Sequence, residues 1–291
     1  MPPLFLYLLL NVRIGRSVKV SIAPTCASLP PDATIRHNAG CFCGQGMLMD
    51  IFGVSVSVLL LAALACFIGA YVQTAIGFGM AVVAAPILFY LDPILVPGPL
   101  MMVLLAMCVT NGWRFRKQLE LNLLAPALLA RIPGSAIGVL LLLLVSQQSL
   151  ALLIAVTIML GVLVRLTNIA LPMTRTNMAI GGFLSGVMGT STTIGGPPMV
   201  LVMHGADIHR IRANLAGFFV VSTLMSVTAL ALGGQLSVSQ LKLALPLVPA
   251  ALLGSWIAAH TLHLISKPIV HYGSLLLCTS AVIGMLINTF F

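Results

Sequence analysis

Gln73-Thr74-Ala75-Ile76-Gly77-Phe78-Gly79 interrupts an apolar run, and Thr190-Ser191-Thr192-Thr193-Ile194-Gly195-Gly196-Pro197-Pro198 interrupts another run later in the chain. Each copy places hydroxyl or amide side chains before glycines, and proline follows. Glycine and proline in an apolar segment free backbone N–H and C=O groups that lipid cannot satisfy, so such breaks persist inside protein or beside a water-filled cavity. A matched pair in two halves indicates a transporter's binding site. The alternative is a pair of kinked helices used only for close packing.

The composition is that of a polytopic membrane protein. The chain has 291 residues, of which 60% are hydrophobic and 7% charged, whereas a soluble domain carries about 25% charged residues. The net charge of +9 does not indicate nucleic-acid binding, because the basic residues are scattered between apolar runs without a basic stripe. Short basic loops on the cytoplasmic side of a lipid bilayer explain this charge better.

Residues 1–46 differ from the rest of the chain. A short apolar run, about residues 3–10, precedes the basic residues, which is the reverse of the order in a signal peptide. Residues 24–46 are polar and rich in turn-forming residues. We interpret 1–46 as a disordered leader or as the product of an upstream start codon, and we leave it out of the predicted fold.

Ten apolar runs follow, and they predict an all-α integral membrane protein in two repeated halves, 47–170 and 171–291. A full span needs about 20 apolar residues, so two of the runs are too short and are predicted to be broken half-helices after the glycine motifs. The first half contains runs at about Ile51–Ile76, Met80–Leu91, Leu95–Asn111, Leu121–Val145 and Leu150–Leu166. The second half contains runs at about Met178–Ile194, Pro198–His204, Ala213–Leu232, Leu241–Leu264 and Ile269–Phe290.

The halves match in detail, and their charges predict opposite orientations in the membrane. Gly134-Ser135 in the first half corresponds to Gly254-Ser255 in the second, and Asp92 corresponds to Asp207. The loop after the third run is basic in the first half, whereas its counterpart, 233–240, has no charge. Under the positive-inside rule, an inverted repeat of five elements places every loop consistently. A parallel repeat of four spans each is the alternative.

Arg131 is the most informative single residue. It lies about ten residues into a predicted span, which at 1.5 Å per residue is roughly 15 Å deep. A guanidinium at that depth costs at least about 2.5 kcal/mol and normally marks an ion or substrate path. Its planar fork suits a pair of carboxylate, sulfonate or sulfite oxygens. The alternative is that the span begins deeper and Arg131 reaches an interface.

Other predicted substrate-binding residues come from the two interruptions and from one nearby loop. Helices that begin at the glycines would offer free N–H groups and the positive end of a dipole to an anion. Serine and threonine at helix contacts also commonly hold helices together, and Asn214 is predicted to be either a gate or a helix cap. The predicted set is Gln73, Thr74, Gly77, Gly79, Thr190, Ser191, Thr192, Gly195, Gly196, Pro197 and Asn214, together with Arg131.

Cofactor and metal chemistry is not predicted. The histidines are dispersed, and the acidic residues fall in the leader or at span ends. A coupling carboxylate inside the membrane and a nucleotide-binding P-loop are both missing from the sequence. We expect neither a metal site nor a bound cofactor, and we expect that the chain does not hydrolyse ATP.

From about Met47 onward the chain resembles the TauE/SafE sulfite-exporter family of membrane permeases. The resemblance rests on Ile76-Gly77-Phe78-Gly79 with Pro86, on the stretch from Gly182 to Pro198, and on Ile211-Arg212-Ala213-Asn214. The first copy has Gly77-Phe78-Gly79 where the family commonly has three consecutive glycines. The resemblance implies a plasma-membrane permease with two repeated halves that moves sulfite, sulfonates or other small organic anions.

The sequence features fit three classes of function to different degrees. A permease that moves a small anion by alternating access is preferred, because the paired breaks and Arg131 fit it. A membrane enzyme is disfavoured, because no His, Cys or acidic residues cluster at one depth. A membrane scaffold or assembly protein is the main alternative, although the loops after Met47 are short for partner binding. The sequence does not predict the oligomeric state.

Overall fold

The computed structural model describes residues 50–51, 54–76, 79–116, 119–166, 171–203 and 208–261, and beyond these only 273, 276, 279–280, 282–284 and 287. The predicted leader, 1–46, and Gly77 lie outside the described residues, as does most of the final run at 269–290. All described residues belong to one compact unit, Gly46–Phe291.

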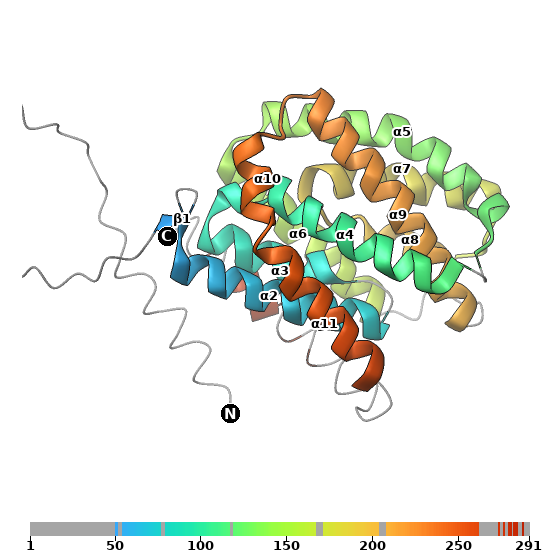
Figure 1. Ribbon diagram of the computed structural model, residues 1–291. Helices are drawn as coiled ribbons and strands as arrows, with labels where there is room; N and C mark the ends of the chain where they lie inside the picture. The colour runs from blue at the N-terminus through green and yellow to red at the C-terminus, as the bar shows by residue number, and fades with distance from the viewer. Residues whose placement is uncertain are drawn as a thin grey trace, which may run out of the picture. The chain divides into compact units, whose positions relative to one another are not determined.

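The described residues are almost entirely helical (Figure 1). A two-residue hairpin, β1 (Asp50–Ile51) against β2 (Val54–Ser55), precedes the helices, with Asp50 paired to Ser55 in an antiparallel register. The helices are α2 (Val56–Ile76), α3 (Met80–Leu91), the 3-10 turn η2 (Pro93–Leu95), α4 (Gly98–Phe115), α5 (Leu121–Leu144), α6 (Gln147–Leu166), α7 (Arg175–Thr192), α8 (Gly196–Met203), α9 (Ile208–Leu232), α10 (Val238–Ala244) and α11 (Leu247–Thr261).

Six stretches of the described residues are long and apolar enough to cross a membrane, which confirms the predicted all-α membrane class. They are Val56–Ala75, Pro93–Arg114, Asn122–Leu144, Gln147–Val164, Ala213–Leu232 and Val238–Thr261. Helix α7 is not among them, because glycine and hydroxyl side chains interrupt its apolar surface.

Both short broken helices are present after the glycine motifs. Helix α3 begins at Met80 and ends at Leu91, as predicted. Gly79 precedes it with φ of 123°, a conformation that L side chains rarely adopt. The second break lies between α7 and α8, where Thr193 caps α7 in the left-handed region with φ of 66°. For a β-branched residue that conformation is strained, and the surrounding contacts hold it in place.

The predicted run at about Leu241–Leu264 coincides with one candidate span, Val238–Thr261, and its last three residues lie outside the described residues. The chain forms two helices there, α10 and α11, separated by a turn at Leu245–Pro246. Proline removes a backbone donor and clashes with the preceding turn of a helix. Its counterpart, Pro126, lies within the unbroken α5, so proline alone does not determine where the segment divides.

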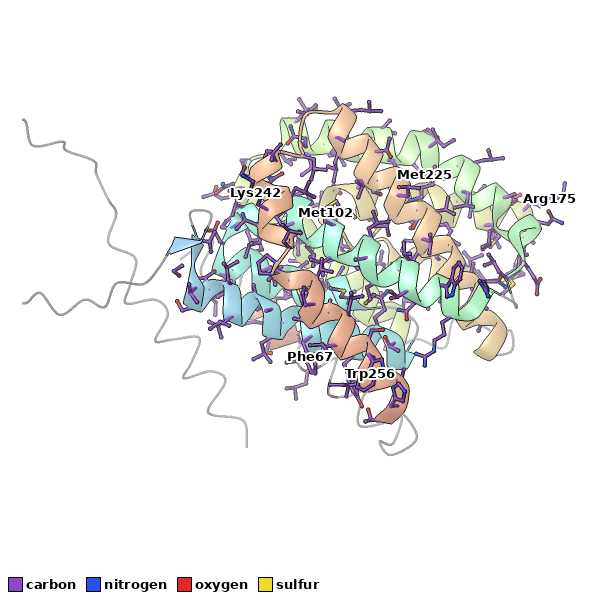
Figure 2. The ribbon with its side chains drawn as sticks, in the orientation of Figure 1. Phe67, Met102, Arg175, Met225, Lys242 and Trp256 are labelled. Atoms are coloured by element: carbon purple, nitrogen blue, oxygen red, sulfur yellow. The ribbon has the colours of Figure 1, made fainter. Side chains whose placement is uncertain are left out.

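The halves are packed reciprocally. Helix α5 of the first half lies along α7 of the second, and α11 of the second half lies along α2 of the first. At both contacts a glycine meets a backbone carbonyl so closely that a Cβ atom would clash: Gly134 against Phe183, and Gly254 against Phe67. Phe67 is labelled in Figure 2. These glycines are the pair matched in the sequence, and each lies at a close helix–helix contact.

The core beside the second break is apolar. It contains Leu124 and Ala127 from α5, Met178 from α7, Met199 from α8 and Phe218 from α9, all buried. Within a bilayer, where lipid tails are as apolar as these side chains, such a core stabilises the fold through close van der Waals packing between helices. This core fixes α5, α7, α8 and α9 around the segment where α7 ends, and it therefore positions the polar groups described next.

Candidate functional site: an arginine-containing cavity at the two breaks

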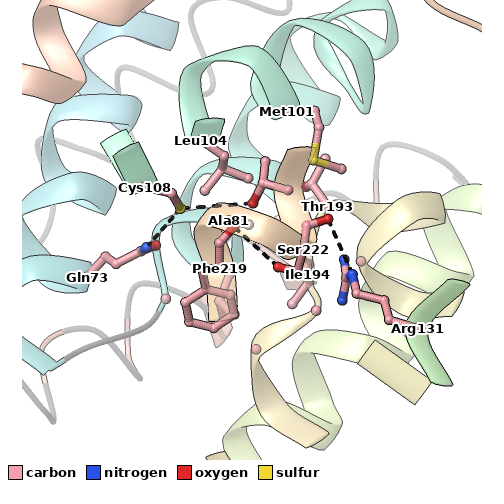
Figure 3. A pocket seen from close by; sticks show the side chains of 16 residues that line it. Gln73, Ala81, Met101, Leu104, Cys108, Arg131, Thr193, Ile194, Phe219 and Ser222 are labelled. Carbon is pink, nitrogen blue, oxygen red and sulfur yellow. Dashed lines mark hydrogen bonds between the residues drawn. The ribbon is translucent and has the colours of Figure 1, made fainter. Parts of the chain in front are cut away.

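A small cavity of about 40 Å³ lies where the two interruptions meet (Figure 3). Gly79, Ala81 and Val82 line it from the first break, and Thr193, Ile194, Gly195 and Gly196 line it from the second. The remaining walls come from Gln73, Met101, Leu104, Cys108, Arg131, Gly189, Phe219, Ser222 and Thr223. A cavity needs a volume of about 10–15 Å³ to hold one water molecule. This cavity therefore has room for about three waters or for one anion of a few heavy atoms.

Arg131 supplies the positive charge at one end of this cavity. Its side chain is 3% exposed, so it does not reach an interface as the alternative interpretation required. Nη1 donates to Ser185 Oγ at 2.6 Å, Nη2 donates to Ser226 Oγ at 2.9 Å, and Nε donates to the carbonyl of Ser222 at 3.3 Å. These partners lie on α7 and α9. All the hydrogen-bond partners of Arg131 among the described residues are neutral.

The serines that hold Arg131 are themselves anchored. Ser185 Oγ donates to the carbonyl of Gly195 at 2.5 Å, which ties the guanidinium to the second break. Ser226 Oγ lies 2.9 Å from Thr190 Oγ1 on α7. Gly189 leaves room for the guanidinium, since a Cβ there would lie 2.8 Å from Nη2. The fork is therefore fixed in orientation by packing and hydrogen bonds, and none of its partners among the described residues carries a negative charge.

The opposite end of the cavity is polar but neutral. Gln73 Nε2 donates to Cys108 Sγ at 4.0 Å, and Thr223 Oγ1 donates to the same sulfur at 3.9 Å. Gln73 Oε1 accepts from the backbone N–H of Met80 at 3.0 Å. Gln73 thus caps the first N–H of α3, so that donor is not free for a ligand as the sequence led us to expect.

Each half-helix offers fewer free amides than a generic helix start. In α3, the N–H groups of Ala81 and Val82 belong to the first turn, where an intrahelical partner is missing, and both residues line the cavity. In α8, Pro197 and Pro198 occupy the first turn and have no N–H. The lining residues that could offer an amide therefore belong mainly to α3 and to Gly195 and Gly196 at the start of α8.

Several predicted residues lie outside the cavity lining and make structural contacts. Thr74 donates to the carbonyl of Ala70 and to Ser255 Oγ, each at 2.9 Å. Ser191 and Thr192 donate to carbonyls one turn earlier in α7. Hydroxyls used in this way satisfy their own helix and do not point at a substrate in this conformation.

Thr190, Pro197 and Asn214 are also structural in this conformation. Thr190 supports Ser226 behind the guanidinium. Pro197 packs against Gly161 of α6. Asn214 Oδ1 accepts from the backbone N–H of Glu120 at 2.9 Å, which ties α9 to the residue just before α5.

Sequence reasoning did not identify some residues that the tertiary structure brings to the cavity. Ser185 and Ser226 position Arg131, and Cys108 and Thr223 form the neutral end. The sequence did contain a signal for the α9 residues, because three hydroxyl side chains lie within the apolar segment 213–232, at Ser222, Thr223 and Ser226. Cys108 gave no such signal, because a lone cysteine in an apolar run is usually a small hydrophobic residue.

The fold and site define a multi-pass α-helical membrane protein with a buried, positively charged cavity at paired helix breaks. A family model described as "Sulfite exporter TauE/SafE" matches residues 51–285. The chain belongs to this family, and it is therefore a multi-pass membrane transporter. Neither the curated proteins nor the solved structures gave a match.

Proposed function

We propose that this chain is a plasma-membrane permease for a small sulfur-containing or organic oxyanion, such as sulfite or a short sulfonate. The observation that carries the proposal is the buried Arg131 guanidinium, which lies beside a cavity and has only neutral described partners. An unpaired buried charge is costly, and an anion in the cavity would compensate it. Arginine is well suited to this role because its fork pairs with two oxygens at once.

The size of the cavity supports a small substrate. About 40 Å³ matches an anion of a few heavy atoms, and sulfite fits this better than a long-chain sulfonate. The apolar side chains Met101, Leu104 and Phe219 complete the lining, so an anion that fills the cavity would leave little room for water beside the guanidinium. Exclusion of water strengthens the attraction between the two charges.

We further propose that transport proceeds by alternating access between two inverted halves. The reciprocal packing of α5 on α7 and of α11 on α2 is the arrangement expected when two similar units exchange roles about a pseudo-two-fold axis. The asymmetric loop charges support opposite orientations under the positive-inside rule. Both breaks line one cavity, so rocking of either half would alter access to the same site.

The direct test is flux in proteoliposomes that contain the purified chain. We expect saturable movement of radiolabelled sulfite, inhibited by short sulfonates and insensitive to amines of similar size. Gly196→Leu places a large side chain in the cavity wall and is expected to abolish flux. The matched control is Gly284→Leu, because Gly284 has nothing within 4 Å of its Cβ position.

Wild-type flux in folded Gly196→Leu protein would place the substrate path elsewhere. If no anion in the panel moves through the wild-type chain, the anion proposal fails and the scaffold alternative gains support. Folding is checked in each case by the thermal unfolding midpoint in detergent.

A further inference from the structure

A second hollow lies on the chain, between the C-terminal half of α4 and α11. It measures about 560 Å³, which is within the usual range for a small-molecule site, about 300–1,000 Å³. It shares no lining residue with the arginine cavity. Its walls include Arg114 and Asn111 from α4, and Leu252, Leu253, Ser255 and Trp256 from α11. We call it the α4–α11 groove.

The mouth of the α4–α11 groove is basic and aromatic. Arg114 lies in the last turn of α4 and is exposed. The guanidinium carbon of Arg116 lies 4.1 Å from the centre of the Trp113 ring. Trp113 and Trp256 are 70% and 61% exposed, and Figure 2 labels Trp256 on α11. Tryptophan is enriched at the headgroup level of membranes. Trp256 lines the groove, and Trp113 is adjacent in sequence to Arg114, so we expect the Arg114 end of the groove to lie near a bilayer interface.

The wall of the groove is apolar, and its floor is polar. Leu252 and Leu253 form the apolar part, and Leu253 is 55% exposed. Asn111 and Ser255 are buried, and Ser255 Oγ donates to Asn111 Oδ1 at 3.3 Å. An occupant must therefore combine a negative group near Arg114 with an apolar portion along α11.

We propose that the α4–α11 groove binds one anionic phospholipid, with its phosphate on Arg114 and an acyl chain along Leu252 and Leu253. A guanidinium pairs with two phosphate oxygens, and the apolar wall matches the chain of the same molecule. The basic ends of the spans are cytoplasmic under the positive-inside rule. Anionic lipids are concentrated in that leaflet, where basic pockets between helices bind their headgroups. The proposal does not depend on the transported substrate.

The test measures lipid binding by native mass spectrometry of the purified chain in detergent. Phosphatidylglycerol is compared with phosphatidylcholine carrying the same acyl chains. We expect preferential retention of phosphatidylglycerol by the wild-type chain, and Arg114→Gln is expected to weaken its binding about fivefold. The matched control, Arg175→Gln, removes an exposed arginine at the start of α7 and leaves binding unchanged.

A steric pair of variants tests the groove independently of charge. Leu253→Trp fills the groove and is expected to reduce retention of phosphatidylglycerol at least as much as Arg114→Gln does. Leu140→Trp, at an exposed leucine of α5, is the control and leaves retention unchanged. Equal retention of both lipids by the wild-type chain would overturn the proposal.

Two further outcomes would also overturn it. In the first, inorganic phosphate at millimolar concentration does not displace the lipid, but it raises the unfolding midpoint of the wild-type chain and not that of Arg114→Gln. The groove would then bind free phosphate. The other is that Leu253→Trp converts a dimer to a monomer without a change in lipid retention, because a second copy of the chain would then occupy the groove.

Discussion

Replacing Arg131 by methionine separates a binding role from a structural one. In α5 the guanidinium is buried and is held by Ser185, Ser226 and the Ser222 carbonyl. An anion about 4 Å away interacts with this charge by about 4 kcal/mol at an effective dielectric constant of about 20. Since about 1.4 kcal/mol is tenfold in affinity, Arg131→Met should weaken anion binding about 1,000-fold.

Although Arg131→Met should weaken anion binding, we expect it to raise the free energy of unfolding or to change it very little. Methionine fills much of the same volume, and it removes a buried charge that has no described counter-ion. Ser185 keeps its bond to the Gly195 carbonyl, and Ser226 keeps its contact with Thr190, so neither serine is left unpaired. Replacement of buried charge by an apolar side chain is often neutral or stabilising. We therefore expect the free energy of unfolding to fall by no more than about 1 kcal/mol, or to rise.

The assay combines concentration-dependent flux in proteoliposomes with thermal unfolding in detergent. Arg131→Lys keeps a charge but loses the fork, and it should give intermediate binding. Arg175→Gln, which removes an exposed arginine of α7, should match the wild-type chain in both measurements. Wild-type flux in Arg131→Met would refute the binding role. A large loss of stability with unaltered affinity in the remaining folded protein would show that Arg131 is structural.

Three further predictions concern the cavity and its supports. With the other five of the six cysteines replaced by alanine, Cys108 should react with a small anionic thiol reagent, and excess substrate should slow that reaction at least about threefold. If substrate does not change the labelling rate, Cys108 does not belong to the site. Gly134→Ala should lower the free energy of unfolding by about 1–3 kcal/mol, because its Cβ meets a carbonyl of α7, whereas Gly284→Ala, in open space, should not; equal unfolding midpoints would argue against the close α5–α7 contact. Asn214→Ala removes the bond to the backbone N–H of Glu120, the residue before α5, and should cost about 1 kcal/mol without a change in the KM for the anion. A raised KM would instead indicate contact with the substrate.

Much of the fold could be predicted because the membrane restricts the choice. An apolar run of sufficient length must be a helix, since its backbone groups have no other partners in lipid. This reasoning located α3 to the residue and α5 to within one residue, and it located the ends of α2 and α9 but missed the start of each by five residues. It did not foresee the turn at Leu245–Pro246, because Pro126 occupies the matching position in an unbroken helix. Packing against neighbouring helices, which the sequence does not display, makes that difference.

The candidate site was predicted less completely, for a geometric reason. The sequence alone indicated the paired breaks and Arg131, because glycine, proline and a guanidinium are costly within an apolar run. It did not determine where each hydroxyl points. A serine or threonine on a helix either bonds its own preceding turn, as Ser191 and Thr192 do, or a neighbouring helix, as Ser185 does. Helix rotation and contact determine that choice, so only the tertiary structure brought Cys108 and Thr223 to the cavity opposite Arg131.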